Sequence, residues 1–264
     1  MSRPYPDAAW LAALRAGADR PPRHPRIALW AGEARIGSVE PDFFGPLTLP
    51  AGLLTKTVRG GEAGWQIDGD VTAGLHVLAM ALRAAGLAHV WRDEQLAVTD
   101  ENGRRLGTVE RAVVRPLGIT TFAVHLIGLS PDGRHWVQQR SLTKANDPGL
   151  WDTLMGGMIP ATDSLAQALE RETWEEAGLR LDQLAQLRHG GRITVRRPTS
   201  EIGAGYVVEH ADWYRCVVPT GVVPANQDGE VAQFRLMDGD EVAARLERDE
   251  FTIEAALILA EAAL

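Results

Sequence analysis

Apolar and polar positions alternate with two different periods along this 264-residue chain. A spacing of three to four residues predicts helices, and in the first half we expect them at about residues 7–17 and 70–85, each opened by an aspartate cap. A period of two predicts strands, which we expect at residues 27–30, 35–39, 95–98 and 105–110. Between them lies a loop rich in Pro and Gly, with four predicted buried anchors: Phe43, Phe44, Leu47 and Leu49.

The second half begins after a boundary at Pro116-Leu117-Gly118 and runs strands, helix, strands, helix. We expect its strands at residues 120–129, 135–139, 193–196, 205–209, 213–218 and 233–236. Its helices are expected at residues 164–178, after a cap at Asp240, and from Thr252 through Leu264. The chain therefore divides into an α+β domain over residues 1–115 and an α/β domain over residues 116–264.

The helix expected at residues 164–178 concentrates negative charge on one face. Glu172 stands three and four positions before Glu175 and Glu176, and Arg171 lies within one turn of Glu175. Each like-charge pair at this spacing costs a few tenths of a kcal/mol, which bound divalent cations with oxygen ligands offset. Upstream, the glycines at 156–157 let the backbone approach a ligand closely. The stretch predicts a metal site, with a solvated acidic helix face as the alternative.

Composition narrows the classes of function. The formal net charge of −8 argues against a general nucleic-acid binder, although bound metal can reverse the local field around a phosphorylated small molecule. Cys216 is the one cysteine, so there is no disulfide framework, and a reducing compartment fits. The first residues lack a signal-peptide pattern, and no apolar run reaches membrane-spanning length. We therefore expect a cytoplasmic protein without a membrane or nucleic-acid partner.

Gly157, Asp163 and the segment from Arg171 to Leu179 together resemble the Nudix box, GX5EX7REUXEEXGU. Asp163 stands where the box has Glu, and Thr173 where it has a bulky aliphatic residue. The resemblance implies a Nudix α/β/α sandwich with a mixed sheet, preceded here by a smaller α+β domain. It also implies a pyrophosphohydrolase that acts on phosphorus anhydrides with Mg²⁺ or Mn²⁺.

The same resemblance implies roles for individual residues. The metal would be held by carboxylates and one carbonyl: Glu172, Glu175, Glu176 and Gly156. Arg171 would orient a glutamate, and the general base stays open between Glu172 and Glu230, with Glu201 and Glu209 as weaker candidates. Arg140 and Lys144 lie just upstream and are suited to bind phosphate, with surface charges as the alternative.

Longer segments extend the resemblance to a subgroup. WRDEQLAV, VERAVVRPLGITTFAVHLIG, RSLTKANDPGLWD and NQDGEVAQFRLM are similar to Nudix proteins that bear an extra N-terminal domain and are associated with thiamine pyrophosphokinase. This implies thiamine diphosphate, or its oxidised or damaged forms, as a substrate cleaved to the monophosphate. Trp151 and Tyr206 are candidates to pack against its rings, with core positions as the alternative.

Other functions stay open beside this one. A nucleoside diphosphate linked to another moiety, such as ADP-ribose or a dinucleotide, is the competing substrate class. Arg-Ser-x-x-Lys before Pro-Gly-x-Trp also resembles isopentenyl diphosphate isomerase, but that enzyme needs a cysteine, and none lies between Thr120 and Arg215. A silent binding module would be expected to lose metal carboxylates, which this chain keeps. Nudix proteins often dimerise, so a homodimer stays open by analogy.

Overall fold

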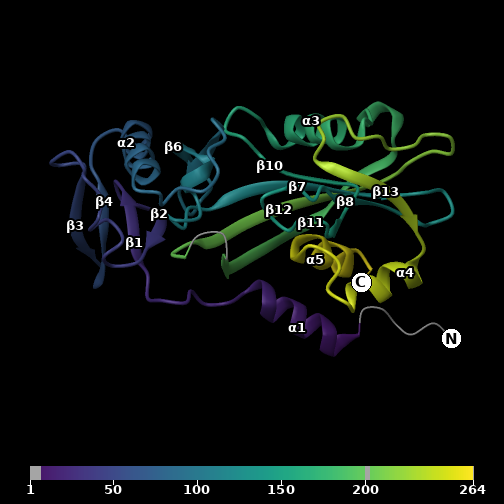
Figure 1. Cartoon of the computed structure of the whole chain (residues 1–264), viewed down its shortest axis with the longest axis horizontal. Coiled ribbons are helices and arrows are strands. Elements are labelled where there is room, and N and C mark those ends of the chain that lie inside the picture. Colours follow the sequence, from purple (N-terminus) through teal and green to yellow (C-terminus); the bar gives the residue numbers. More distant parts are fainter. Residues whose placement is uncertain (1–6, 200–202, 264) are drawn as a thin grey trace.

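The computed structural model describes residues 7–199 and 203–263, whose strands form sheets in two regions of the molecule (Figure 1). The small N-terminal sheet has the order β2-β1-β4-β3, and the mixed sheet of the second half has the order β11-β12-β7-β8-β13. Short strands β10 and β9 extend the mixed sheet beside β7 and β8, while β5 and β6 form a separate hairpin. The strand bounds in the first half are β1 Ile27–Ala31, β2 Ala34–Val39, β3 Leu54–Arg59, β4 Glu62–Ile67, β5 Gln95–Thr99 and β6 Arg105–Glu110. In the second half they are β7 Thr121–Leu129, β8 His135–Arg140, β9 Trp151–Asp152, β10 Met155–Met158, β11 Ala185–Pro198, β12 Tyr206–Val217 and β13 Val231–Met237.

The helices begin at capping side chains that accept hydrogen bonds from the first turn. Their bounds are α1 Ala8–Ala18, α2 Val71–Ala84, α3 Leu165–Ala177, α4 Gly239–Leu246 and α5 Ile253–Ala262, with 3-10 turns η1 Arg111–Val113 and η2 Leu181–Gln183. The expected cap of α4 at Asp240 is wrong. Asp238 has the extended backbone of a cap and accepts from the Glu241 N–H at 2.8 Å, which leaves Asp240 in the first turn.

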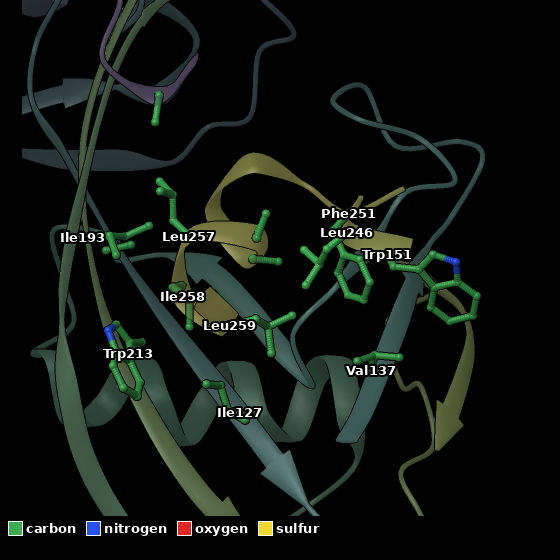
Figure 2. Packing of buried hydrophobic residues seen from close by; sticks show 14 of the residues in the cluster. Ile127, Val137, Trp151, Ile193, Trp213, Leu246, Phe251, Leu257, Ile258 and Leu259 are labelled. Carbon is green, nitrogen blue, oxygen red and sulfur yellow. The ribbon is translucent and has the colours of Figure 1, made fainter. Parts of the chain in front are cut away.

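Helices cover both faces of the mixed sheet, as Figure 1 shows, with α3 on one side and α4 and α5 on the other. On the α5 side, Leu257 and Ile258 pack with Ile127 and Trp213 of the sheet (Figure 2). Helix α1, from the start of the chain, joins this core through Ala18 and the partly buried Leu14. The expected α/β/α sandwich with a mixed sheet, preceded by a small N-terminal region with its own sheet, is confirmed.

The opening that holds the site arises where β7 and β8 diverge. The two strands pair only at Gly128–Trp136 and Leu129–His135. Beyond those pairs, β10 takes the place beside β7, with Gly156 opposite His125, and β9 lies beside β8. The gap brings the glycines of β10, the strand β8 and the helix α3 close to one another.

The N-terminal region is fixed to the second half by backbone contacts at the β5–β6 hairpin. Leu96 forms a bridge with Pro160, and the Ala161 N–H donates to the Gln95 carbonyl at 2.7 Å. Arg26 adds a second fastening, because its guanidinium donates to the carbonyls of Ala204 and Pro116. These bonds place one end of the N-terminal region against β10.

Several strand assignments differ from expectation: the short strands β9 and β10 were not predicted, and β11 is longer than the expected residues 193–196. The β3–β4 hairpin was not predicted, because its strands are half exposed and lie between glycine- and proline-rich segments; Gly60 and Gly61 both adopt positive φ at its turn. One continuous strand, β12, replaces two expected strands, since its residues stay paired with β11 over its whole length. Within residues 7–199 and 203–263, no helix combines the length and apolar character required to cross a membrane.

Candidate active site

Helix α3 directs its carboxylates toward the gap beside β10. Capping residues fix the two ends of the helix, and its apolar face packs on the sheet. Ser164 and Gln167 form a capping box at its start, and Gly178 ends it with a left-handed conformation at φ 61°. Ala168 and Leu169 are buried in the core between α3 and the sheet. This orientation is what forces Glu176, one of the helix's polar residues, into a position that is only 1% exposed.

Glu176 is held by donors from three directions. Gln138 Nε2 donates to its Oε2 at 2.7 Å, the Gly156 N–H donates to the same oxygen at 2.9 Å, and Lys144 Nζ lies 3.2 Å from Oε1. Burial raises the pKa of Glu176 above its usual range, although Lys144, Gly156 and Gln138 each oppose the rise. Three donors therefore fix the position of the Glu176 carboxylate, but they do not fully offset the cost of burying its negative charge.

Glu172 lies one turn earlier and relies on a glycine for its position. A Cβ on Gly157 would come within 2.3 Å of the Glu172 carboxyl carbon, so only glycine allows the carboxylate to lie against β10. Burial and the charge of Glu176 raise the pKa of Glu172 to about 7, despite Arg171 at 3.0 Å. Arg171 alone therefore does not supply enough positive charge to keep the Glu172 carboxyl fully ionised near neutral pH.

Arg171 contacts the other carboxylates beside α3, Glu175 and Asp163. Its Nη1 lies 2.7 Å from Glu175 Oε2, and its Nε donates to Asp163 Oδ2 at 2.9 Å. Asp163 thus contacts the arginine, which explains how the shorter aspartate is accommodated where the box has glutamate. Glu175 is the most exposed of these carboxylates, with 41% of its side chain open to solvent.

The loop after β8 supplies the cations predicted there. Lys144 bridges Glu176 and Glu230, with its Nζ 2.6 Å from Glu230 Oε2. Burial raises the pKa of Glu230, but the hydrogen bond and charge of Lys144 outweigh it, and the net shift is downward. Arg140 lies 3.4 Å from Asp152 Oδ2 and donates to the Asn146 carbonyl at 3.0 Å.

One cavity of about 520 Å³ extends across the gap to the α5 side of the sheet, and it is lined by Glu172, Glu175 and Glu176 together with Arg171, Arg140, Lys144 and Glu230. Its far wall carries Glu209 of β12 and Glu254 of α5. Thr121 Oγ1 donates to Glu209 at 3.0 Å, whereas Arg197 remains 3.9 Å from Glu254. Burial and the charge of Glu209 raise the pKa of Glu254 to about 6, despite Arg197.

A buried ion pair lies between the two carboxylate groups. His125 Nδ1 is 3.6 Å from Asp152 Oδ1 and 3.1 Å from Thr153 Oγ1. Burial alone would raise the pKa of Asp152, but the adjoining His125, together with Arg140, lowers it to about 2. Burial disfavours the charged imidazole, yet Asp152 raises the pKa of His125 overall. The pair links a residue of β7 to one of β9, and both residues line the cavity.

The donor set of the cavity fits a hard divalent cation. Carboxylate oxygens are what such cations prefer, and Glu172 and Glu176 are under-neutralised in a cavity. Gln138 Oε1, in the same carboxamide that holds Glu176, is buried and has no hydrogen-bond partner in the described part of the chain. Across those residues no three His, Cys, Asp or Glu side chains converge closely enough to hold an ion, and Lys144 and Arg171 lie against the carboxylates.

The structure places the two expected substrate contacts, Trp151 and Tyr206, outside the lining of the cavity. Trp151 is 5% exposed and packs in the core with Phe251 and Leu246, with the Arg245 guanidinium over its ring. Tyr206 turns toward the N-terminal linker, where its hydroxyl donates to the Arg20 carbonyl at 2.9 Å. On the same two strands it is the neighbouring residues, Asp152 and Val207, that line the cavity.

Sequence reasoning missed several groups that line the cavity. Glu209 was ranked as a weak candidate, Glu254 and the His125–Asp152 pair were not considered, and Glu201 lies outside the described residues. A signal existed for Glu254, which is a lone carboxylate followed by the apolar run AALILA. Charged residues are rarely buried in such a segment unless they are paired or bind a ligand.

Comparisons with known proteins agree with the architecture. Residues 120–257 match the model of the NUDIX domain. An uncharacterized Nudix hydrolase of Pseudomonas aeruginosa is 37% identical over 123 residues, which is 47% of this chain and 68% of that protein. The chain spans about half the length, or less, of further curated relatives from Saccharomyces cerevisiae and Arabidopsis thaliana.

Two further similarities bear on fold and on chemistry. A protein of Deinococcus radiodurans superposes with a TM-score of 0.52 at 18% identity, over 64% of this chain and 99% of that one, which supports the fold alone. An isopentenyl-diphosphate Delta-isomerase of Streptomyces avermitilis is 30% identical over 160 residues, covering 60% of this chain and 77% of the isomerase. Hydrolases and isomerases are therefore both found among the relatives.

Proposed function

The chain belongs to the NUDIX domain family, and from this premise we propose that it hydrolyses a diphosphate linkage in a small organic diphosphate with the help of a divalent cation. The observation that carries this proposal is the placement of Glu176. A carboxylate only 1% exposed, fixed by Gln138 and the Gly156 N–H, faces a cavity beside Glu172 and beside cations suited to phosphate. A structural salt bridge alone does not require that arrangement.

Mg²⁺ or Mn²⁺, when bound, would neutralise charge on the phosphates and lower the pKa of an attacking water. We assign the metal to the carboxylates and one carbonyl: Glu172, Glu175, Glu176 and Gly156. Gln138 and Arg171 keep these carboxylates oriented, since each already donates to one of them. Arg140 and Lys144 would orient the phosphate that does not react. The proton acceptor is either Glu172 or Glu230, both of which line the cavity.

For the organic part of the substrate, we favour thiamine diphosphate or its oxidised or damaged forms, cleaved to the monophosphate. Glu209 and Glu254 support this choice, because a buried and a partly buried carboxylate with one distant cation favour a group that carries positive charge or amino donors. The thiazolium and aminopyrimidine of thiamine offer both. The resemblance of the longer segments to proteins associated with thiamine pyrophosphokinase points in the same direction.

The alternatives make different demands on the cavity. ADP-ribose, and a dinucleotide without a nicotinamide ring, carry amino donors but no cationic ring, and among the described residues they would leave Glu254 with Arg197 as its cation. A silent binding module would not need the glycine that admits the Glu172 carboxylate against β10. For these reasons we favour hydrolysis of a thiamine-type substrate over both alternatives.

Isomerase chemistry is disfavoured by the position of the cysteine. The isomerase resemblance requires a cysteine beside the active-site loop, yet Cys216 lies on β12 with its side chain in the core under α3. Burial raises the pKa of Cys216 to about 12, so its thiol stays protonated near neutral pH. It does not line the cavity.

We also propose a division into an N-terminal domain over residues 1–115 and a hydrolase domain over residues 116–264. Separate hydrophobic cores support it, although Leu117 and Ile119 belong to the first core and α1 packs on the second. A homodimer is proposed by family analogy and tested by solution mass.

The test is Mg²⁺-dependent release of product from a panel containing thiamine diphosphate, oxythiamine diphosphate, ADP-ribose and a dinucleotide. We expect turnover of the diphosphates that carry a cationic thiazolium to exceed turnover of ADP-ribose, and chelation to stop both. If ADP-ribose were the one compound hydrolysed, the substrate would be a nucleoside diphosphate linked to another moiety, and the thiamine assignment would be wrong. Absence of hydrolysis for every compound with Mg²⁺ and Mn²⁺ would refute the enzymatic proposal.

A further inference from the structure

The N-terminal region contributes a wall to the active-site cavity. Arg92, Glu94, Arg111 and Arg115 all line it, although they precede the matched family domain, which begins at residue 120. They come from the segment around the β5–β6 hairpin and η1. The bridge between Leu96 and Pro160 fixes this segment beside β10, so the wall belongs to the folded site.

Arg92 and Arg111 differ from the other cations of the cavity in how they are paired. Lys144 and Arg171 already contact the carboxylates of the proposed metal site. Arg111 Nη1 lies 2.7 Å from Glu94 Oε2, and the side chain, which is 34% exposed, also lines the cavity. Within residues 7–199 and 203–263 the Arg92 side chain makes no hydrogen bond or ion pair; its backbone N–H donates to Glu110 Oε1 at 3.1 Å.

These two arginines lie next to the reacting region. Their charges, after that of Lys144, help to lower the pKa of Glu230, against the opposing effect of burial. Glu230 is bound to Lys144, and Lys144 is bound to Glu176, so the order across the cavity is arginine wall, Glu230, lysine, metal carboxylates. A diphosphate over the carboxylates would extend its far phosphate toward the wall.

We propose that Arg92 and Arg111 bind the terminal phosphate and make the site select diphosphates that end in a free phosphate over those esterified at both ends. A free terminal phosphate carries about −1.5 to −2 charges at pH 7, and Arg binds its oxygens in a bidentate fork. A phosphate esterified on both sides carries about one negative charge and has fewer free oxygens for the fork. This selection rests on the proposed hydrolysis, and it gives the N-terminal region a role in substrate choice.

The test uses ADP and ADP-ribose, which share every atom up to the second phosphate and differ in whether that phosphate is free. Calorimetry measures the affinity of each for the full chain with Ca²⁺ in place of Mg²⁺ and in the cold, to suppress turnover. We expect Arg92→Gln and Arg111→Gln each to weaken ADP binding about five- to ten-fold and ADP-ribose binding less than about two-fold. Arg104→Gln, on an exposed arginine in the turn of the same hairpin, should change neither.

An equal loss for both ligands, or no loss for either, would overturn the selection. Arg92→Gln decides the matter even if Arg111→Gln disturbs folding, because the Arg92 side chain makes no hydrogen bond or ion pair within residues 7–199 and 203–263. The KM for thiamine diphosphate separates this inference from the proposed function. If Glu176→Gln stops turnover while Arg92→Gln leaves the KM and the ADP affinity unchanged, the hydrolase stands and the arginine wall is refuted.

Discussion

Two groups of buried carboxylates face the same cavity from opposite sides, and they are paired very differently. On α3, Glu176 receives donors from a side-chain amide, a backbone N–H and a lysine. On the far wall, Glu254 has one cation at 3.9 Å and lies beside the charge of Glu209. Burying a charge is costly unless it is paired, so both groups need added positive charge, but of different kinds.

The difference indicates what each group binds. The α3 carboxylates are fixed rigidly, which suits a small cation that requires ligands at defined distances. Among the described residues the far-wall carboxylates have fewer donors, one hydroxyl on Glu209 and one arginine 3.9 Å from Glu254, which suits an organic group with a diffuse charge. The cavity thus separates the chemistry of the phosphates from recognition of the rest of the substrate.

The largest expected effect comes from removing a carboxylate of the first group. Glu176→Gln should lower kcat by a factor of about a thousand, because it removes a metal ligand while keeping the shape of the side chain. The melting temperature should change little, since the amide still accepts from Gly156. Glu170→Gln, on the exposed face of the same helix, is the control and should retain wild-type turnover. Wild-type rates for Glu176→Gln would show that the ligand assignment is wrong.

A smaller effect, on a different kinetic constant, is expected at the far wall. Glu209→Gln and Glu254→Gln should raise the KM for thiamine diphosphate about ten-fold and leave kcat within about three-fold, because the lost interaction is present in ground and transition states alike. An uncharged alkyl diphosphate should be insensitive to both changes. Equal KM increases for substrates with a cationic and with an uncharged organic group would mean that these carboxylates support the fold and do not bind the cationic group.

The far wall should also affect stability in a pH-dependent way. The pKa of Glu254 is about 6 in the folded chain against 4.5 as its ordinary value, so folding binds the proton more tightly. Its stabilising contribution is therefore complete below about pH 4.5 and is lost as the pH rises through 6. Glu254→Gln removes this loss, and relative to wild type it should gain about 2 kcal/mol in unfolding free energy between pH 4.5 and pH 8.

Denaturant titration of both proteins at the two pH values measures this gain. Glu261→Gln, near the other end of α5 and outside the cavity, provides the same change of charge as a control. A gain of the same size in the control would assign the effect to the general charge of the protein, and no gain in Glu254→Gln would show that the carboxyl is already neutralised.

The smallest effect is expected at a residue that faces neither group. Cys216→Ala should leave turnover within about two-fold of wild type and cost about 1 kcal/mol of stability, since the thiol is a small buried apolar group. Product analysis by NMR with isopentenyl diphosphate tests the isomerase alternative at the same time. Isomerised product that disappears in Cys216→Ala would contradict the placement of the thiol outside the cavity.

The sequence predicted one of the two carboxylate groups and largely missed the other, for a physical reason. The spacing of Glu172, Glu175 and Glu176 is local, so one helix turn suffices to infer that they lie together. Glu209 and Glu254 stand 45 positions apart on a strand and a helix. They meet only because β12 pairs with β7 and α5 folds across that sheet. No local pattern encodes such an approach.

The positions of helices and strands were likewise predicted well where a local sequence pattern encodes them. Capped amphipathic helices such as α2 and α3 were predicted to within about a residue at each end, because their caps are encoded in the sequence. The half-exposed β3–β4 hairpin was not, since its apolar pattern is weak. Trp151 and Tyr206 could be read as core or as ligand contacts, and only strand pairing resolved which way each side chain points.

The most direct test of the central claim is anomalous diffraction from crystals grown with Mn²⁺ and a non-hydrolysable diphosphate analogue. We expect a manganese peak about 2.0–2.3 Å from carboxylate oxygens of Glu172 and Glu176, with Lys144 moved from Glu176 to a phosphate oxygen. A map without such a peak, with Lys144 and Arg171 still bound to the carboxylates and the analogue elsewhere, would contradict the assignment of α3 as the metal-binding element.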